Sequence, residues 1–385
     1  MVAIAVAGLS LVIWLFLLVF WGGFWRANQR LSPAKTTLSN YPRVCALVPA
    51  RNEAAVITEG IASLLSQNYP GDLTVVLIDD NSSDRTAELA RETALNLHKS
   101  ESLQIVTGQP LKPGWKGKLW ALYQGLKLAT TSMPLPDYWL LTDADIRHDQ
   151  DNLTRLVTQA ETENLDLVSL MVLLRCQSTW EKLLIPAFVF FFQKLYPFAW
   201  VNNPQKSLAA AAGGCILISR EALTSIGGIE TIKDALIDDC SLARAVKIAN
   251  KQIWLGLTET TVSLRGYDDL TTIWDTIART AYDQLQYSPL LLLGTTLGMA
   301  LVYLTAPAAI LVGAIATNYL LLGIGIATWL LMSWAYLPTL RLYKLSWTWV
   351  FCLPAIAFLY TLMTIDSALK YYRGQGGAWK GRTYQ

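Results

Sequence analysis

The amino-acid sequence predicts an α/β domain on a mainly parallel sheet, with transmembrane α-helices at both ends. Apolar residues make up 53% of the 385 residues and charged residues only 16%, a composition that disfavours a purely soluble protein. The apolar excess is concentrated in uncharged runs near the two ends of the chain. Between these runs, short β-rich segments alternate with helical patterns, which favours a sheet with helices on both faces.

The remaining composition excludes several classes of protein. A net charge of +2 gives no reason to expect a nucleic-acid partner. Five cysteines are dispersed without a CxxC pair, which indicates reduced thiols and neither a disulfide framework nor a zinc site. His98 and His148 are the only histidines, which argues against histidine-rich metal sites and Ser-His-Asp chemistry.

The N-terminal run, Val2–Trp25, contains no charge and exceeds the roughly 20 residues that a helix needs to cross a bilayer. Basic residues follow it at Arg26, Arg30, Lys35 and Arg43. This order indicates a signal anchor whose following segment stays in the cytoplasm. We therefore expect a transmembrane anchor at 1–25 and a multi-pass protein of the inner (plasma) membrane whose middle domain lies in the cytoplasm.

The C-terminal region, 288–365, predicts two to three further passes. Ser288–Leu340 carries no charge and is too long for one crossing, with Pro307 and Asn318 as break points. Leu345–Ile365 is long enough for another crossing. Three full crossings place the basic tail at 366–385 outside, whereas the positive-inside rule prefers it inside. A re-entrant stretch around Pro307 is one resolution, and the side of the tail stays open.

The middle region, 43–286, has the length of a single α/β domain. The expected strands are Val44–Val48, Val75–Ile78, Gln104–Val106, Trp139–Leu141 and Ile216–Ile218, and the expected helices are Ala54–Ser66, Asp84–Leu97 and Lys118–Ala129. Ligands bind such sheets outside the carboxyl ends of the strands. The aromatic-rich segment 180–200 predicts an amphipathic helix in the membrane surface, with a buried core helix as the alternative.

Five polar segments carry the chemistry, and three of them directly follow expected strands. They are Val48–Ala54, Ile78–Thr86, Gly114–Leu122, Leu141–Asp145 and Leu236–Leu242. In this order they resemble the inverting glycosyltransferases of family 2, and the resemblance covers about 45–285. It implies the GT-A fold, a Rossmann-like catalytic domain. Ala211–Arg220 and Ile277–Leu285 further resemble the membrane-bound hopene-associated glycosyltransferases, relatives of ceramide glucosyltransferase.

The acidic segment Asp143-Ala-Asp145 suits a metal-assisted transfer. Departure of a sugar from its nucleotide leaves negative charge on phosphate, which a hard divalent cation held by carboxylates neutralises. An extended chain places Asp143 and Asp145 on one side. The resemblance implies a DxD motif that binds Mg²⁺ or Mn²⁺. Asp145 is then the direct metal ligand, and Asp143 contacts both the metal and the donor. A solvated acidic loop is the alternative.

The first two segments are candidates for the nucleotide site. The resemblance implies that Asp79 and Asp80 hold uracil and ribose, and a carboxylate that accepts from uracil N3–H favours a UDP-linked donor. A turn stabilised by Asx hydrogen bonds is the alternative. Pro49, Arg51 and Glu53 are expected in the same pocket, although Arg51 has the alternative of an ordinary surface charge.

Lys116, Lys118 and Arg279 are candidates for binding the diphosphate. The two lysines flank Gly117 at an expected helix start, where free N–H groups and positive charge favour phosphate. We expect one lysine to reach the donor. For the other lysine, a donor contact and a position in solvent both stay open. Arg279 has the alternative of a juxtamembrane charge. The family's Q/RxxRW motif is not intact in Arg279–Gln284, because the Arg-Trp pair is missing.

The acidic pair Asp238-Asp239 is the candidate catalytic base. Inversion needs a carboxylate that takes the proton of the attacking hydroxyl, and the resemblance assigns this role to Asp239, with Asp238 as its support. A helix start favoured by the helix dipole is the alternative. Gly213, Gly214 and Gln284 are expected on the acceptor side, although packing alone also explains the glycine pair.

The segments and the resemblance that they carry imply transfer of a sugar, expected from a UDP-hexose, to a membrane lipid hydroxyl in hopanoid or other glycolipid synthesis. Three alternatives stay open. A polyprenyl-phosphate sugar transferase has an anionic acceptor, a processive polysaccharide synthase makes long products, and a non-enzymatic membrane scaffold transfers nothing.

Overall fold

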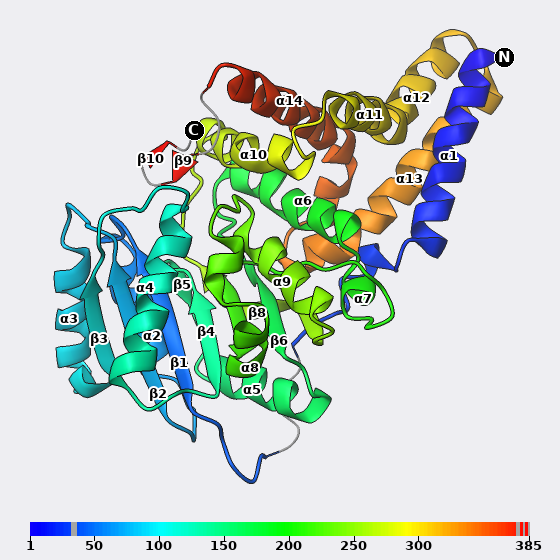
Figure 1. Ribbon diagram of the computed structural model, residues 1–385. Helices are drawn as coiled ribbons and strands as arrows, with labels where there is room; N and C mark the ends of the chain where they lie inside the picture. Colours follow the sequence, from blue (N-terminus) through cyan, green and yellow to red (C-terminus); the bar gives the residue numbers. More distant parts are fainter. Residues whose placement is uncertain (32–36, 375–377, 380–381, 384–385) are drawn as a thin grey trace.

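The computed structural model describes residues 1–31, 37–374, 378–379 and 382–383. An α/β domain lies in the lower part of Figure 1 and a group of long apolar helices in the upper part, with helix α6 (Thr179–Leu195) between them. Lys35 lies outside the described residues, as do residues 375–377, 380–381 and 384–385 of the expected basic tail at 366–385. The start of that tail continues the last helix as far as Tyr372.

One eight-stranded sheet forms the centre of the α/β domain, in the order β3-β2-β1-β4-β7-β6-β8-β5. Its strands are β1 (Val44–Ala50), β2 (Leu73–Asp79), β3 (Leu103–Thr107), β4 (Tyr138–Thr142), β5 (Ile146–Arg147), β6 (Leu167–Leu173), β7 (Cys215–Ser219) and β8 (Ile253–Ser263). The pairs β3–β2, β2–β1, β1–β4 and β6–β8 are parallel. The pairs β4–β7, β7–β6 and β8–β5 are antiparallel.

Every expected strand lies within an observed one, whereas β5, β6 and β8 were not among the sequence-based expectations. Residues of β1 alternate between two apolar cores because successive side chains of a strand point to opposite faces. Cys45 and Leu47 pack on one face, and Val44, Ala46 and Val48 pack on the other. Both faces of the sheet are therefore buried, as in α/β proteins generally.

Helices cover both faces of the sheet, as expected. One core is completed by α2 (Ile57–Leu65), α3 (Thr86–Asn96) and α5 (Asn152–Glu163). The opposite core is completed by α4 (Gly117–Ser132), α8 (Arg220–Ser225) and α9 (Asp238–Ile248). The expected helices at 54–66, 84–97 and 118–129 correspond to α2, α3 and α4. All five cysteines are free thiols.

Five helical stretches among the described residues are long and apolar enough to cross a membrane. They are Val2–Phe20, Thr179–Val201, Pro289–Ile315, Tyr319–Leu342 and Trp347–Tyr372. The first is α1, and the last three contain α11 (Pro289–Met299), α12 (Thr305–Ile315), α13 (Tyr319–Leu342) and α14 (Leu353–Tyr372). The apolar helices and α10 (Leu270–Gln284) share one buried cluster.

The chain turns at Asn318, one of the two expected break points. The Asn318 side chain accepts a hydrogen bond from the backbone N–H of Leu321 at 3.1 Å, which caps the start of α13. Pro307 instead lies within α12, one turn after the π-helical segment Ala300–Leu304. A π-helical turn accommodates the missing N–H of proline, so the helix continues through Pro307.

Helix α6 is packed on two sides. Ile185 and Val189 belong to a core of the sheet, whereas Leu184 and Phe190 are buried among the apolar helices. The following helix α7 (Phe198–Val201) continues this contact. The segment expected at the membrane surface therefore joins the two parts of the molecule, and its depth in a bilayer stays a prediction.

The end of α1 contacts the turn between α6 and α7. Gly22 has a φ of 61°, and a Cβ atom there would lie 2.6 Å from the Cβ atom of Pro197, so only glycine fits. The ring centroids of Trp21 and Trp200 are 4.9 Å apart, and the Trp21 indole N–H donates to the Lys194 carbonyl at 2.9 Å. These contacts fix α1 to the α/β domain.

Gly60 of α2 provides a test of this packing, since a Cβ atom there would lie 2.4 Å from the Ala144 carbonyl oxygen. We expect Gly60→Ala to lower the free energy of unfolding by about 1–3 kcal/mol through overpacking. Gly323→Ala in α13 is the control, because a Cβ atom there meets nothing within 4 Å. Thermal unfolding of both full-length variants in detergent micelles measures the effect, and equal melting temperatures contradict this account of Gly60.

Candidate active site

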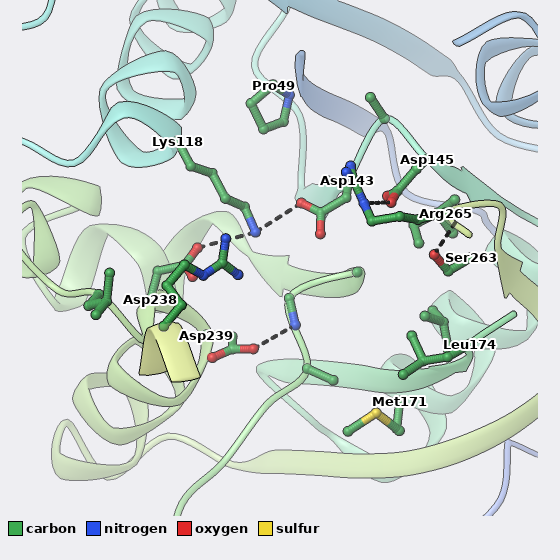
Figure 2. Close-up of a pocket in the computed structure, with 18 of the residues that line it drawn as sticks. Pro49, Lys118, Asp143, Asp145, Met171, Leu174, Asp238, Asp239, Ser263 and Arg265 are labelled. Atoms are coloured by element: carbon green, nitrogen blue, oxygen red, sulfur yellow. Dashed lines mark hydrogen bonds and ion pairs between the residues drawn. The ribbon is translucent and has the colours of Figure 1, made fainter. Parts of the chain in front are cut away.

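A cavity of about 470 Å³ opens at the carboxyl ends of β1 and β4, where ligands bind in sheets of this kind. Figure 2 shows side chains from several segments pointing into it. Eleven of the sequence-predicted site residues line this cavity: Pro49, Glu53, Lys116, Lys118, Asp143, Asp145, Gly213, Gly214, Asp238, Asp239 and Arg279. Arg51, Asp79, Asp80 and Gln284 do not line it.

The antiparallel strand β7 brings the glycine pair to the end of β4. Thr142, the last residue of β4, lies opposite Cys215, the first residue of β7. The hydroxyl of Thr142 donates to the carbonyl of Gly214 at 2.8 Å. Gly213 and Gly214 therefore lie beside the segment Asp143–Asp145, and a Cβ atom on Gly213 would lie 3.1 Å from the Lys118 ammonium nitrogen.

Lys118 lies between two acidic segments (Figure 2). Its ammonium nitrogen is 2.9 Å from a carboxylate oxygen of Asp143 and 3.3 Å from one of Asp238. Burial alone lowers the pKa of Lys118, but the negative charges of Asp143 and Asp238 outweigh it and raise this pKa above its ordinary value. Lys118 is therefore a permanent positive charge within the site.

Lys116 also reaches the cavity, from the residue before α4. Burial lowers the pKa of Lys116, and the charges of Asp283 and Asp234 partly oppose that change. The backbone N–H of Lys116 donates to the Lys233 carbonyl at 2.8 Å, which connects the start of α4 to the segment before α9.

Asp239 at the start of α9 is held by two backbone donors. Its carboxylate accepts hydrogen bonds from the N–H of Gly213 at 2.8 Å and from the N–H of Cys240 at 2.7 Å. Burial raises the pKa of Asp239 to about 6 and the negative charge of Asp238 adds to this rise, while Lys118 opposes it. A carboxylate with this pKa changes its protonation close to neutral pH.

Arg265 is a site residue that sequence reasoning missed. Its guanidinium donates to a carboxylate oxygen of Asp145 at 2.7 Å and to one of Glu53 at 2.9 Å, and Figure 2 shows the contact with Asp145. Arg265 follows β8, whose Ser263 pairs with Ile146 of β5. A basic residue two positions after a strand was the available signal, but neither β5 nor β8 was expected.

Arg51 and the two acidic residues after β2 form a neighbouring cluster. The Arg51 guanidinium donates to the Asp80 carbonyl at 2.6 Å and lies 3.7 Å from the Asp80 carboxylate. The Asp79 carboxylate accepts from the Ser82 N–H at 3.1 Å, which is an Asx-type turn. Arg51 is therefore a structural partner of Asp80, and the nucleotide contacts expected here stay predictions.

The wall of the cavity towards α6 is largely apolar. Phe188 and Phe192 of α6 line it together with Met171 and Leu174, at and after the end of β6. Figure 2 shows Met171 and Leu174 on the side of the cavity away from Lys118. The site is thus polar at the strand ends and apolar next to the long helices.

Gln284 lies near this wall but outside the cavity lining. Its side chain shares hydrogen bonds of 2.8 Å and 3.1 Å with the hydroxyl of Tyr196, which follows α6. In the structure, Gln284 connects the end of α10 to the end of α6. Gln284 was expected on the acceptor side. Its effect on an acceptor stays a prediction.

The carboxylates suit a hard divalent cation. Asp143 and Asp145 offer oxygen ligands two residues apart on one side of the cavity, and Mg²⁺ is usually held by one or two carboxylates together with substrate phosphates. Within the part of the chain that the structure describes, no three His, Cys, Asp or Glu side chains group as a complete metal site. The pair therefore fits a cation that a phosphate ligand completes.

Comparison with known sequences places the α/β domain in a family. Residues 45–227 match the model of glycosyl transferase family 2. The probable glycosyltransferase YdaM of Bacillus subtilis is 33% identical over 122 residues, which are 30% of this chain and 28% of the relative. The beta-monoglucosyldiacylglycerol synthase of Synechocystis sp. is 53% identical over 47 residues, 12% of this chain and 10% of the relative. The chain thus spans less than a third of either relative.

A solved structure shares the fold over nearly the whole chain. The mannosyltransferase PcManGT from Pyrobaculum calidifontis, solved in complex with GDP-Man and Mn²⁺, is 21% identical. The match covers 95% of this chain and 99% of that chain, with a TM-score of 0.59. The expected GT-A fold class is confirmed.

Removal of the Lys118 charge tests the electrostatics of the site. We expect Lys118→Met to lower the free energy of unfolding by about 2 kcal/mol, because it leaves the carboxylates of Asp143, Asp238 and Asp239 without their shared cation. Lys118→Arg keeps the charge and is the matched control. Melting temperatures of the two full-length variants measure the difference, and a Lys118→Met variant as stable as Lys118→Arg refutes the expectation.

Proposed function

We propose, from the premise that this chain carries a glycosyltransferase family 2 domain with the GT-A fold, that it transfers a sugar from a nucleotide donor to a lipid hydroxyl. The observation that carries the proposal is the arrangement of the cavity. Asp143 and Asp145 on one side face Asp238 and Asp239 on the other, and the remaining wall is apolar. The reaction is a single displacement at the anomeric carbon that inverts its configuration.

The strand-end side of the cavity is the proposed donor site. Asp143 and Asp145 hold Mg²⁺ or Mn²⁺, which when bound neutralises the charge that develops on the diphosphate. Lys116 and Arg279 line the same cavity and contribute positive charge towards the phosphates. Asp79 and Asp80 bind the nucleoside, and their carboxylates favour uridine.

Asp239 is the proposed general base. Its pKa of about 6 leaves it ionised near neutral pH and still able to accept a proton from an attacking hydroxyl. The N–H groups of Gly213 and Cys240 hold its two oxygens. Asp238 supports it by holding Lys118, which limits the rise of the Asp239 pKa.

The apolar wall supports a lipid acceptor. Phe188 and Phe192 belong to α6, whose other side packs among helices that are long and apolar enough to cross a membrane. An acceptor chain that leaves the cavity beside α6 is therefore next to the proposed bilayer. The name of the Synechocystis relative, a glycolipid synthase, agrees with this acceptor class. We place the catalytic domain on the cytoplasmic side of the inner membrane.

The cavity favours a neutral alcohol over an anionic acceptor. Two of its cations, Lys118 and Arg265, are already paired with carboxylates, so fewer positive charges are left for a polyprenyl phosphate. The incomplete Q/RxxRW motif at Arg279 argues against a processive polysaccharide synthase. Hopanoids and other glycolipids are both compatible with a hydroxyl acceptor.

A labelling experiment tests the proposed function. Purified full-length enzyme is incubated with a panel of radiolabelled UDP- and GDP-sugars, total membrane lipid and Mg²⁺ or Mn²⁺. We expect one labelled neutral glycolipid with a single added sugar in β-linkage. A labelled lipid phosphate identifies the polyprenyl-phosphate alternative, a long labelled polymer identifies a processive synthase, and no binding of any nucleotide sugar supports a scaffold.

Substitution of the acidic pair tests the base. Asp239→Asn keeps the size of the side chain but cannot accept the proton, so we expect kcat to fall by about 10²- to 10⁴-fold with donor affinity nearly unchanged. Asp238→Asn is the matched control at the neighbouring residue, and its fall in kcat should be smaller. In the wild-type enzyme kcat should fall as pH drops below about 6, because protonated Asp239 cannot act as a base.

Single-turnover and donor-binding assays across pH measure these effects. If Asp238→Asn is the inactive variant and Asp239→Asn is active, the two roles are reversed. If both variants keep near-normal turnover, the pair is only a helix start and the base lies elsewhere.

A further inference from the structure

Arg265 presents its guanidinium to the aspartate that we propose as the direct metal ligand. The distance from its Nε to a carboxylate oxygen of Asp145 is 2.7 Å, and the distance from its Nη2 to a carboxylate oxygen of Glu53 is 2.9 Å. The side chains of Asp145 and Glu53 are 7% and 10% exposed, whereas that of Arg265 is 36% exposed. Two nearly buried carboxylates thus share one cation at the rim of the cavity.

The backbone beside Arg265 is attached to the same segment as Asp145. The N–H of Leu264 donates to the carbonyl of Asp145 at 2.7 Å, and Ser263 pairs with Ile146 across β8 and β5. These two contacts hold the backbone immediately before Arg265. The guanidinium is therefore the part of the residue that is able to move.

The other side of the loop is fixed to α6. A Cβ atom on Gly266 would lie 1.7 Å from a guanidinium nitrogen of Arg175, so the backbone passes directly over that group. Arg175 pairs with Asp268 at 3.0 Å, and the N–H of Tyr267 donates to the buried carboxylate of Glu181 at 2.8 Å. The loop is thus held on both sides of Arg265.

A divalent cation and this guanidinium require the same carboxylate. Like charges repel strongly at short range where water is largely excluded, so a metal ion gains the full attraction of Asp145 only when Arg265 moves away. Glu53 retains the guanidinium at 2.9 Å and gives it a second anionic partner when it leaves Asp145. A donor diphosphate adds further negative charge that offsets the crowding of the two cations.

We propose that Arg265 competes with the divalent cation for Asp145, so that the cation binds tightly only together with the donor diphosphate. This inference rests on the proposed metal-dependent transfer and adds an order of binding to it. Arg265 is in this view a positioning residue that neutralises Asp145 and Glu53 in the empty site. It disfavours premature occupation of the DxD motif by a metal ion without donor.

Binding of Mn²⁺ to the full-length, donor-free enzyme tests the competition. Isothermal titration calorimetry or electron paramagnetic resonance reports binding directly, without turnover. We expect Arg265→Gln to bind Mn²⁺ about 10-fold more tightly than the wild type, because the competing charge is removed. Arg147→Gln is the matched control, since Arg147 follows Ile146 but pairs with Glu59 at 2.8 Å and not with Asp145. Its Mn²⁺ affinity should equal that of the wild type.

A second measurement adds the nucleotide. In the wild type UDP should strengthen Mn²⁺ binding, and this coupling should shrink in Arg265→Gln because the free site is already open to metal. Arg265→Lys keeps the charge with fewer donors, so its gain in Mn²⁺ affinity should be smaller, and it serves if Arg265→Gln does not fold. Unchanged or weaker Mn²⁺ binding by both variants overturns the proposal.

The two proposals fail in different ways. An enzyme that glycosylates lipid while both Arg265 variants bind Mn²⁺ no better than the wild type disproves the competition alone. An enzyme that shows the gain in Mn²⁺ affinity but labels no lipid with any sugar disproves the transferase function alone.

Discussion

Lys118 places one positive charge between Asp143 at the end of β4 and Asp238 at the start of α9, and the geometry of the cavity depends on that charge. The two acidic segments come from opposite sides of the cavity and would repel each other without it. The same charge keeps the pKa of Asp239 from rising further. Because α4 begins at Gly117, a helix that also packs against the sheet fixes the position of this cation.

Strands of both directions bring residues to the edge of the sheet where the cavity lies. Parallel strands β1, β2 and β4 bring their carboxyl ends to one edge, which gathers Pro49, Asp79 and Asp143 in one region. Strand β7 runs in the opposite direction, so its beginning delivers Gly213 to the same edge. Strand β8 runs parallel to β6, and its carboxyl end brings Arg265 to this edge. The site is therefore assembled from strand ends and strand beginnings that are far apart in the sequence.

The distance in sequence between contacting residues also explains which parts of the site could be predicted. Asp143, Asp145, Lys118 and Asp239 were predicted as site residues because they lie in short polar segments at strand ends or helix starts, which are a local pattern. The resemblance to family 2 then implied the roles of Asp145 and Asp239. The contact of Arg265 with Asp145 spans 120 residues and depends on β5, a strand of two residues without detectable periodicity. For α6 the sequence pattern indicated an apolar, aromatic-rich helix. No local feature of the sequence indicates that one side packs on the sheet and the other packs among the apolar helices.

The contact between Gly22 and Pro197 has a consequence for the proposed lipid acceptor. If α1 crosses the bilayer as we propose, this contact and the Trp21–Trp200 pair fix the height of the α/β domain above the membrane, since tryptophans favour the interface. The proposed base is then held at a constant depth. With the proposed lipid acceptor, transfer requires that the hydroxyl reach that depth, so acceptors are selected by the distance between the reactive oxygen and the hydrocarbon core.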